Sequence, residues 1–306
     1  MQAFAPGIYP RSEALVRATR DLDRGRTTPE AVDEQFDADL EQLVEAQRGA
    51  RLDLLSDGML RWQDLFRPLL EASDGLETGA LTRFLDTNTF FRAPRAASAA
   101  PKLTEPLGEP YIVPLPGPRL VTLPSPFALA LGTGLSPIDV AEGVLRPQID
   151  ALETDLVVLS EPFLARADDV DLDELSSALD ILADGPPVVL QLTVGDAQPL
   201  LEQGVGQLPI EGIGVDFYAT QASAIPVGFG KLLVAGVVDA RSSALEEAEA
   251  IAAFAASLHE RGVGEIALAP NGDLQFVSEP IARQKLFRLA EAARLRTEEH
   301  GWASRF

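Results

Sequence analysis

The sequence predicts an α/β protein built as a (β/α)₈ (TIM) barrel, and three observations favour this fold. Short apolar segments alternate with longer amphipathic ones, as strands and helices do in a parallel sheet covered on both faces. Eight such segments can be found, and no Gly-x-Gly-x-x-Gly turn follows any of them, which disfavours an open dinucleotide-binding sheet. With 306 residues, 46% of them hydrophobic, the chain has the length and core of a single barrel domain over residues 1–306.

The predicted strands follow one another along the whole chain. A short first strand is expected at 3–7. Seven further strands are expected where the apolar runs are nearly continuous, at 52–56, 119–123, 155–160, 188–192, 212–216, 232–237 and 265–268.

Helix starts lie between these strands. Thr28-Pro29 and Ser136-Pro137 each place a capping side chain before a proline in the first turn. Ser243, with a glutamate three residues later, has the spacing of a capping box. Apolar residues recur at helical spacing from Val32 to Val44, which predicts a helix face packed on the core.

One region departs from this rhythm. Residues 73–118 are rich in glycine, proline, threonine and asparagine and show no helical period. We expect an irregular, β-rich insertion after the second strand, located at the barrel mouth, with strands at 82–84 and 89–92.

Composition excludes several classes of function. There are 47 acidic and 25 basic residues, a net charge of −22, which disfavours nucleic acid as a partner. The chain has no cysteine, so disulfides, thiolate metal ligands and cysteine nucleophiles are excluded. Its two histidines, His259 and His300, are expected at solvated helix ends. No segment has the pattern of a signal peptide or a membrane span, so we expect a cytoplasmic protein without membrane contact.

The candidate site is the set of polar residues at or after the predicted strand ends, because function gathers there in such barrels. Arginines among carboxylates suit a small zwitterion or another carboxylate-bearing molecule. We expect Arg11, Asp57, Arg61, Glu161 and Asp239 to line one pocket, with Arg61 as the cation facing Glu161; capping of local loops is the alternative. The full set is Tyr9, Arg11, Asp57, Arg61, Asp64, Ser125, Ser160, Glu161, Gln191, Thr193, Asp216, Tyr218, Asp239, Arg241 and Asn271.

Several segments resemble, in order, motifs of the cobalamin-independent methionine synthase family. They span nearly the whole chain. The segments are Gly-Ile-Tyr-Pro-Arg-Ser (7–12), Leu-Asp-Leu-Leu-Ser-Asp-Gly (52–58), Leu-Arg-Trp-Gln-Asp-Leu (60–65), Leu-Pro-Ser-Pro-Phe (123–127), Ser-Glu-Pro-Phe-Leu (160–164), Val-Val-Asp-Ala-Arg-Ser (237–242) and Ala-Pro-Asn-Gly-Asp-Leu (269–274).

The resemblance also implies a degenerate metal site. The family holds zinc with a histidine, two cysteines and a glutamate, and these positions fall near 191–193, on Gly272 and near 216–217. Met59 replaces the glutamate that binds the amino group of homocysteine, and Ser160 replaces the aspartate of the Asp-Glu-Pro motif. The chain therefore looks most like the stand-alone barrels of this family that lack the zinc ligands, a likeness carried by residues 60–62 and 86–91.

Three functions are consistent with this resemblance. The first is methyl transfer to homocysteine or a related thiol in methionine biosynthesis, from a methylated folate or another donor and without tightly bound zinc. The second is a non-catalytic, methyl-donor-binding partner of a separate zinc-bearing barrel. The third is a metal-free activity on a small carboxylate, similar to that of uroporphyrinogen decarboxylase barrels. Whether the protein is an enzyme stays open at this point.

Overall fold

A computed structural model describes residues 1–168 and 170–299, with side chains through residue 295. His300, expected at a helix end, lies outside the described residues. In the described part of the chain no helix is long and apolar enough to cross a membrane.

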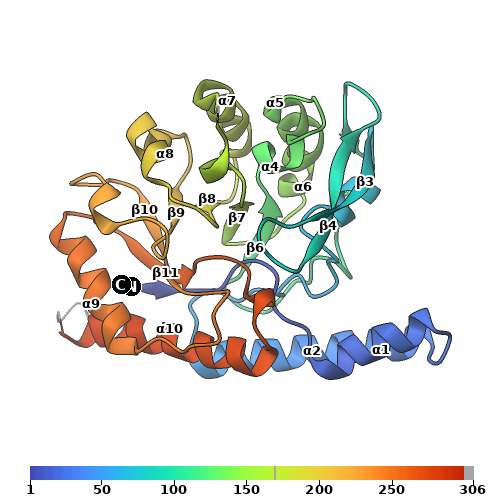
Figure 1. Cartoon of the computed structure of the whole chain (residues 1–306), viewed down its shortest axis with the longest axis horizontal. Helices are drawn as coiled ribbons and strands as arrows, with labels where there is room; N and C mark the ends of the chain where they lie inside the picture. The colour runs from blue at the N-terminus through green and yellow to red at the C-terminus, as the bar shows by residue number, and fades with distance from the viewer. Residues whose placement is uncertain (169, 300–306) are drawn as a thin grey trace.

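The centre of the fold is a curled sheet of seven parallel strands (Figure 1). Six of its strands largely coincide with predicted segments, whereas β1 shares only Ala3 with the strand predicted at 3–7. Every neighbouring pair is parallel. In sheet order the strands are β1 (Gln2–Ala3), β11 (Ile266–Pro270), β10 (Leu232–Val238), β9 (Gly212–Asp216), β8 (Val188–Leu192), β7 (Leu156–Glu161) and β6 (Leu120–Pro124). The predicted α/β class and parallel sheet are confirmed.

Residues 53–55 occupy the eighth place, between β1 and β6. The Asp53 N–H donates to the Ala3 carbonyl at 2.9 Å, and Leu55 makes a single parallel bridge to Arg119. The predicted strand at 52–56 is thus reduced to one bridge. These bonds join the two edge strands and close the curled sheet.

The interior of this ring is filled by side chains from most of its members. A separate apolar cluster contains Phe4, Leu54, Leu120, Leu156, Val158, Val189, Val234, Ala267 and Ala269. The strand β9 contributes glycines instead, and a Cβ on Gly214 would lie 2.7 Å from Gln191 Cγ. The barrel is therefore packed to its axis, as the fold requires.

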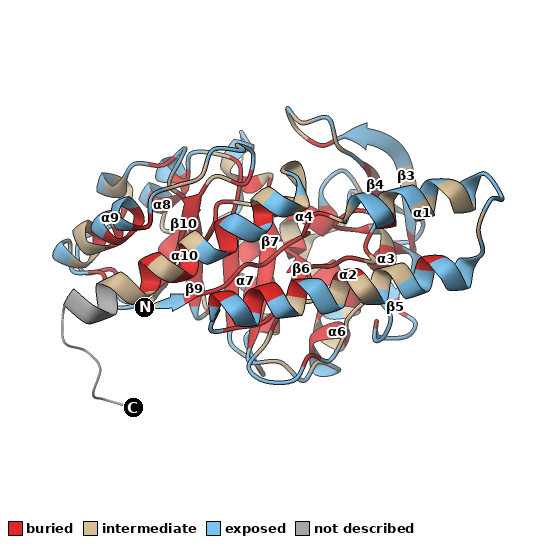
Figure 2. Ribbon diagram, turned by 90° about the horizontal axis from the view of Figure 1, so that it is seen from below, coloured by how far each residue is buried: buried red, intermediate tan, exposed pale blue. Residues whose placement is uncertain are grey.

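Helices cover the outside of the sheet and turn their buried faces towards it, while their outer faces are exposed (Figure 2). The longest is α2 (Pro29–Ala50), which lies beside α10 (Glu279–Glu299); the others are α1 (Glu13–Asp23), α3 (Arg67–Glu71), α4 (Pro126–Ala130), α5 (Pro137–Val140), α6 (Arg146–Asp150), α7 (Leu172–Leu182), α8 (Gln198–Gln203) and α9 (Ala248–Glu260). A π-helical turn, η1 (Ala141–Leu145), and the 3₁₀ turns η2 (Leu164–Arg166), η3 (Val205–Gln207), η4 (Ala222–Ala224) and η5 (Leu274–Phe276) complete the helical elements.

Two of the three predicted helix starts are confirmed. Thr28 accepts a hydrogen bond from the Ala31 N–H, and Ser136 forms a capping box. The prediction at Ser243 is wrong, because α9 begins at Ala248 and the carboxylate of Glu246 binds a buried lysine instead.

The insertion is β-rich, as predicted. The strands β3 (Leu76–Arg83) and β4 (Phe90–Ala96) form an antiparallel hairpin, and β2 (Ser73–Asp74) pairs with β5 (Lys102–Leu103). The predicted strands at 82–84 and 89–92 fall on the two arms of the hairpin. The tip between those arms reaches the loops that follow β7 and β11 (Figure 1).

Candidate functional site

Three predicted site residues meet at the carboxyl ends of β8, β9 and β11. Asn271 donates from Nδ2 to Asp216 Oδ1 at 2.9 Å, and its side-chain oxygen Oδ1 accepts from the Ala240 N–H at 2.8 Å. Gln191 donates to the Pro270 carbonyl at 3.0 Å. All three side chains are buried. The structure thus brings Gln191, Asp216 and Asn271 into one polar cluster, which we call the strand-end cluster.

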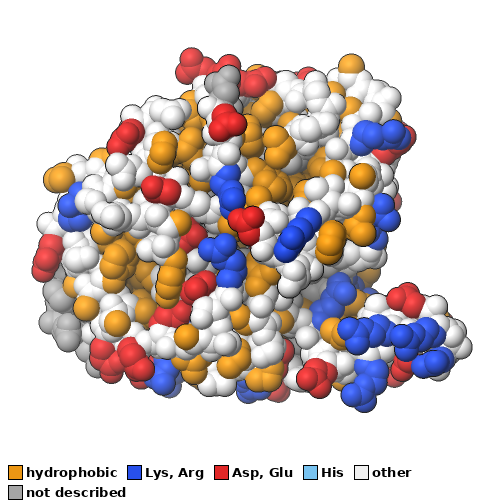
Figure 3. Space-filling model, viewed as in Figure 1, with side chains coloured by type: hydrophobic (Ala, Val, Ile, Leu, Met, Phe, Trp, Pro, Cys, Tyr) orange, Lys and Arg blue, Asp and Glu red, His pale blue; other side chains and the backbone are white. Residues whose placement is uncertain are grey.

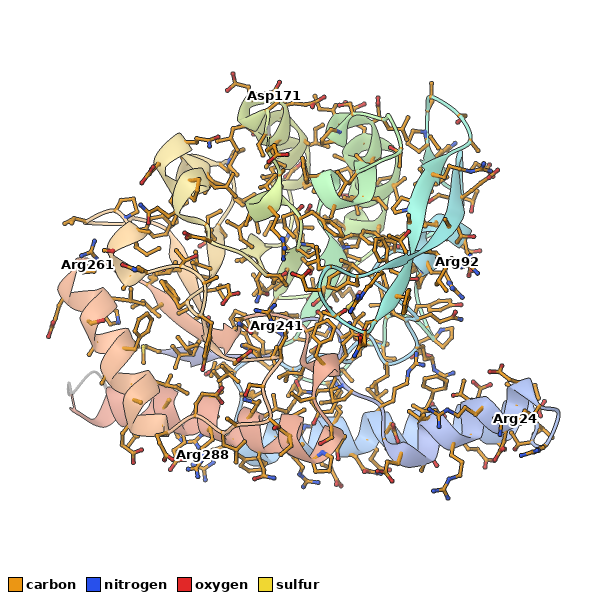
Figure 4. All side chains as sticks on the ribbon, in the orientation of Figure 1. Arg24, Arg92, Asp171, Arg241, Arg261 and Arg288 are labelled. Atoms are coloured by element: carbon orange, nitrogen blue, oxygen red, sulfur yellow. The ribbon has the colours of Figure 1, made fainter. Side chains whose placement is uncertain are left out.

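Asp216 is the unsatisfied member of this cluster. Its Oδ1 accepts from the Tyr218 N–H at 2.9 Å and from Asn271, whereas its Oδ2 is buried without a hydrogen-bond partner in the described part of the chain. Burial raises the pKa of Asp216, and hydrogen bonding and the charge of Arg241 oppose that shift. Arg241 lies near the middle of the face seen in Figure 4. A buried acceptor left open is uncommon and marks a place where a ligand can donate.

Thr193 and Gly272 lie on either side of the same region. A Cβ added to Gly272 would be 3.8 Å from Thr193 Cβ, although the two residues follow β11 and β8, which are three places apart in the sheet. Two of the positions that the family resemblance assigns to zinc ligands, 193 and 272, therefore lie close together. In Figure 3 basic side chains lie near the middle of this face, although the chain as a whole is strongly acidic.

The residues present at these positions do not suit zinc. Thr193 and Gly272 provide no thiolate or imidazole, and the Gln191 amide nitrogen is used as a donor. In residues 1–168 and 170–299 no group of three or more His, Asp or Glu side chains is placed to share a metal ion. The absence of tightly bound zinc stays a prediction.

A second buried group links Ser125, Ser160 and Glu161 at the ends of β6 and β7. The Ser125 hydroxyl donates to Glu161, and the Ser125 N–H donates to the Ser160 carbonyl at 3.0 Å. The other carboxylate oxygen of Glu161 accepts from the Phe163 and Leu164 N–H groups at 2.7 and 2.8 Å. Burial raises the pKa of Glu161, and these hydrogen bonds oppose the shift. Glu161 thus caps the loop after β7.

The expected pairing of Arg61 with Glu161 is wrong. The Arg61 guanidinium binds the carboxylates of Asp33 and Asp37 on α2, the second at 3.1 Å, and lies 4.6 Å from the Phe36 ring centre. It borders a pocket of about 280 Å³ between α2 and the insertion.

Asp57 also lines this outer pocket. Its oxygens accept from the Met59 and Val113 N–H groups at 2.9 and 3.0 Å, and burial raises its pKa. The five residues expected to share one pocket are therefore divided, since Asp57 and Arg61 lie at this outer edge and Glu161 lies in the loop after β7.

Arg11 and Asp64 hold loops in place. Arg11 donates to the carbonyls of Leu60 and Trp62, both at 2.9 Å. Asp64 accepts from the N–H groups of Phe66 and Arg67 at the start of α3, and its second oxygen accepts from the Arg92 N–H on the hairpin at 3.0 Å. Both side chains therefore contribute to the structure of these loops.

Tyr9 lies apart from the strand-end cluster. Its hydroxyl is buried, and in the described residues it has no hydrogen-bond partner. Burial raises the pKa of this phenol.

Tyr218 and Asp239 contact a network that the sequence did not predict. Glu246 accepts from the Tyr218 hydroxyl at 3.1 Å and from the Asp239 N–H at 2.9 Å. The ammonium of Lys285, whose side chain is fully buried in α10, binds both oxygens of Glu246. Asp239 itself caps its own turn through the Arg241 N–H. Lys285 is one of only three lysines in an arginine-rich chain, and this rarity is the feature of the sequence that could have singled it out.

Asp273 is a second residue that sequence reasoning missed. Its carboxylate accepts from the Ile8 N–H at 3.2 Å and from Gln275 at 3.1 Å, so it joins the loops after β1 and β11. Burial raises the pKa of Asp273 to about 6.

Comparison with solved structures shows the same fold over nearly the whole chain. No model of a known protein family matches the sequence, and no curated protein matches it. A B12-independent methionine synthase from Shewanella sp. W3-18-1, in complex with selenomethionine, has a TM-score of 0.72 at 15% identity, covering 97% of this chain and 98% of the other.

Two further structures agree. A protein from Listeria monocytogenes assigned as a vitamin-B12-independent methionine synthase has a TM-score of 0.69 at 17% identity and covers 98% of both chains. A methyltransferase from Methanosarcina mazei has a TM-score of 0.55 at 15% identity, covering 97% of this chain and 94% of the other. The resemblance found in the sequence is confirmed for the fold: the chain has the barrel of B12-independent methionine synthase structures.

Proposed function

We propose that this protein is a barrel of methionine biosynthesis that takes part in methyl transfer to homocysteine or a related thiol and binds its ligand at the strand-end cluster. The observation that carries the proposal is the whole-length fold match to B12-independent methionine synthase structures. It is supported by the convergence of Gln191, Thr193, Asp216 and Gly272 at one end of the barrel.

The chain's own residues would bind and orient the ligand. The open Oδ2 of Asp216 would accept a hydrogen bond from a ligand N–H or O–H, and Arg241 would form an ion pair with a ligand carboxylate. A methylated folate is the methyl donor expected from the resemblance.

A second function, that of a non-catalytic partner, has one observation in its favour. Gln191, Thr193 and Gly272 stand where the resemblance places zinc ligands, and these residues do not suit zinc. Activation of the thiol would then come from a separate zinc-bearing barrel. In that case this chain would hold the methyl donor and the second barrel would activate the acceptor.

One assay tests both functions. The purified protein is supplied with homocysteine and 5-methyltetrahydropteroyltriglutamate, and methionine is measured alone and after addition of a zinc-bearing B12-independent methionine synthase barrel. Zinc in the purified protein is measured in parallel. Methionine formed by the chain alone supports the first function, and methionine that requires both proteins supports the second. If this chain adds nothing in either arm, the proposal fails.

A matched pair of variants ties the assay to the strand-end cluster. Asp216→Asn removes the open carboxylate oxygen and should lower activity or donor binding by at least tenfold, the range for losing a hydrogen bond to a charged group. Asp180→Asn makes the same change on the exposed side of α7 and should have no effect. Equal effects of the two substitutions would exclude the strand-end cluster as the binding site.

A further inference from the structure

The tip of the β3–β4 hairpin lies over the centre of the barrel mouth. The Phe84 ring is 5.9 Å from the ring of Phe163, in the loop after β7, and 6.1 Å from that of Phe276, in the loop after β11. In the sheet β7 and β11 are four places apart in a ring of eight, when residues 53–55 are counted as the eighth member. They lie on opposite sides of the barrel, so a side chain that contacts both loops spans the opening.

The polar residues of the candidate site lie beneath this side chain. Phe163 is two residues after Glu161, whose carbonyl accepts from the Thr193 N–H at 3.0 Å. Phe276 is four residues after Gly272, which faces Thr193. Phe84 is buried, as are Thr193 and the strand-end cluster. Thr193 and the strand-end cluster are therefore shielded from solvent in this conformation, in which the hairpin tip contacts the loops after β7 and β11.

The contacts that hold the tip against the barrel are mainly between aromatic rings. The rings of Phe66, Phe84, Phe91, Phe163 and Phe276 form one aromatic group. One polar contact adds to these rings: the Arg166 guanidinium donates to the Asp86 carboxylate at 3.1 Å, and both side chains are exposed. In the described part of the chain, residues 84–89 make no other hydrogen bond to the barrel loops. An exposed pair of this kind contributes little.

The tip is internally bonded and its base is anchored, so it can move as a unit. The Phe84 N–H donates to Thr89, the Thr87 N–H and hydroxyl donate to Phe84, and the Arg83 guanidinium donates to Thr87. The pairing of β3 with β4 shifts register between Thr78 and Leu81, which divides the tip from the base. The hydrogen bonds within the tip would stay intact if it left the mouth. A swing about the register shift would break one hydrogen bond at its base, from the Arg92 N–H to Asp64 at 3.0 Å.

We propose that the β3–β4 hairpin is a gate, with Phe84 as the plug that must leave the barrel mouth before a ligand can reach the strand-end cluster. The gate opens by a swing of the tip about the register shift and closes through the aromatic group. This inference concerns access and holds whichever methyl donor or acceptor the site takes.

The absence of cysteine makes the gate directly measurable. Thr193→Cys places one thiol beneath Phe84, and its alkylation by iodoacetamide requires the mouth to open. Gly272→Cys is a second reporter, because a Cβ there meets Thr193 at ordinary contact distance. Gly272 is partly exposed, so only the change in its rate with Phe84→Ala reports the gate. Ala178→Cys, on the fully buried face of α7, reports unfolding of the whole barrel. The gate predicts that Thr193→Cys reacts faster than Ala178→Cys.

Two phenylalanine substitutions on the same hairpin separate gating from destabilisation. Phe84→Ala removes the plug and should accelerate alkylation of the mouth reporters by roughly ten- to a hundredfold, from the loss of one buried aromatic side chain. Phe90→Ala makes the same change at a half-exposed position and should leave the rate within about twofold. Asp86→Ala should act weakly, by a few-fold at most.

The rate at Ala178→Cys decides between the interpretations. If Phe84→Ala accelerates the mouth reporters and leaves Ala178→Cys unchanged, the hairpin is a gate. If the mouth reporters react as slowly as Ala178→Cys in every background, or if Phe84→Ala accelerates all three equally, the hairpin is a fixed roof and the proposal is overturned. No step of this test depends on methyl transfer, so its outcome is independent of the proposed function.

Discussion

Replacing Lys285 by methionine tests the buried network behind the loop that carries Asp239 and Arg241. The Lys285 side chain is 0% exposed, and its ammonium donates to the Ala244 carbonyl at 2.6 Å and to the Glu246 oxygens at 2.9 and 3.0 Å. All three donors are used. Methionine keeps most of the volume and removes the charge, so the variant isolates the ion pair.

The expected loss is about 3 kcal/mol in the free energy of unfolding. Removing one partner of a buried pair typically costs about 3–5 kcal/mol. Glu246 is 12% exposed and keeps its hydrogen bonds from Tyr218 and Asp239, which places the loss at the lower end. In a chain of 306 residues that corresponds to a fall of roughly 5 °C in Tm.

Urea denaturation followed by far-ultraviolet circular dichroism measures the effect. The double variant Lys285→Met/Glu246→Gln should lose at least about 1 kcal/mol less than the sum of the single variants, because neither partner is then left as an unpaired charge. Lys231→Met is the matched control, since in the described part of the chain the Lys231 ammonium donates to carbonyls alone, those of Leu208 and Ile210. A loss below 1 kcal/mol for Lys285→Met, or strict additivity in the double variant, would refute the reasoning.

Three further substitutions follow from the strand-end loops. Glu161→Gln should lower the free energy of unfolding by about 1–3 kcal/mol, because an amide cannot accept from Ser125 and from two N–H groups as the carboxylate does; an unchanged urea midpoint would contradict this. Asp273 has its pKa raised to about 6, so the folded state holds the proton more tightly than the unfolded state, and stability should be full near pH 4 and fall by up to about 3 kcal/mol as the pH rises through 6. Asp273→Asn should therefore stabilise the protein at pH 7.5 and not at pH 4, which urea titrations at the two pH values will check. Gly7→Ala should destabilise by about 1–3 kcal/mol, since Gly7 has φ +84° and its Cβ would lie 2.1 Å from Asp273; a thermal melt within 1 °C of the parent would exclude this.

The sheet could be predicted because its strands are buried on both faces. The segments at 188–192 and 212–216 agree with β8 and β9 to the residue. The sequence did not show that the strand expected at 52–56 would be interrupted. Side chains make hydrogen bonds there that the backbone of a neighbouring strand would otherwise make. Asp53 accepts from the Ala3 N–H through its carboxylate, and the Gln47 amide binds both the N–H and the carbonyl of Ser56. Such substitutions depend on partners that sequence periodicity does not show.

The candidate site was predictable only for residues that end a strand. Gln191, Asp216 and Asn271 directly end or follow β8, β9 and β11, and the parallel sheet fixes where they lie. Arg61 is several residues beyond its strand, and the course of its loop takes it to Asp33 and Asp37 on α2. The exposed carboxylates on that helix were visible in the sequence, but their distance from Arg61 was not.

The two buried carboxylates that end strands of this barrel, Glu161 and Asp216, differ in how many hydrogen bonds they accept. Glu161 receives a hydroxyl and two backbone N–H groups, so its oxygens are used within the fold and a ligand would have to displace them. Asp216 receives its donors on one oxygen and keeps the other open in the described part of the chain. A buried acceptor without a hydrogen bond is unfavourable, so a donor from a bound molecule would gain free energy of binding by pairing with it. Of the two, Asp216 is therefore the carboxylate at which ligand binding is expected, and Glu161 is the one whose loss should be seen in stability.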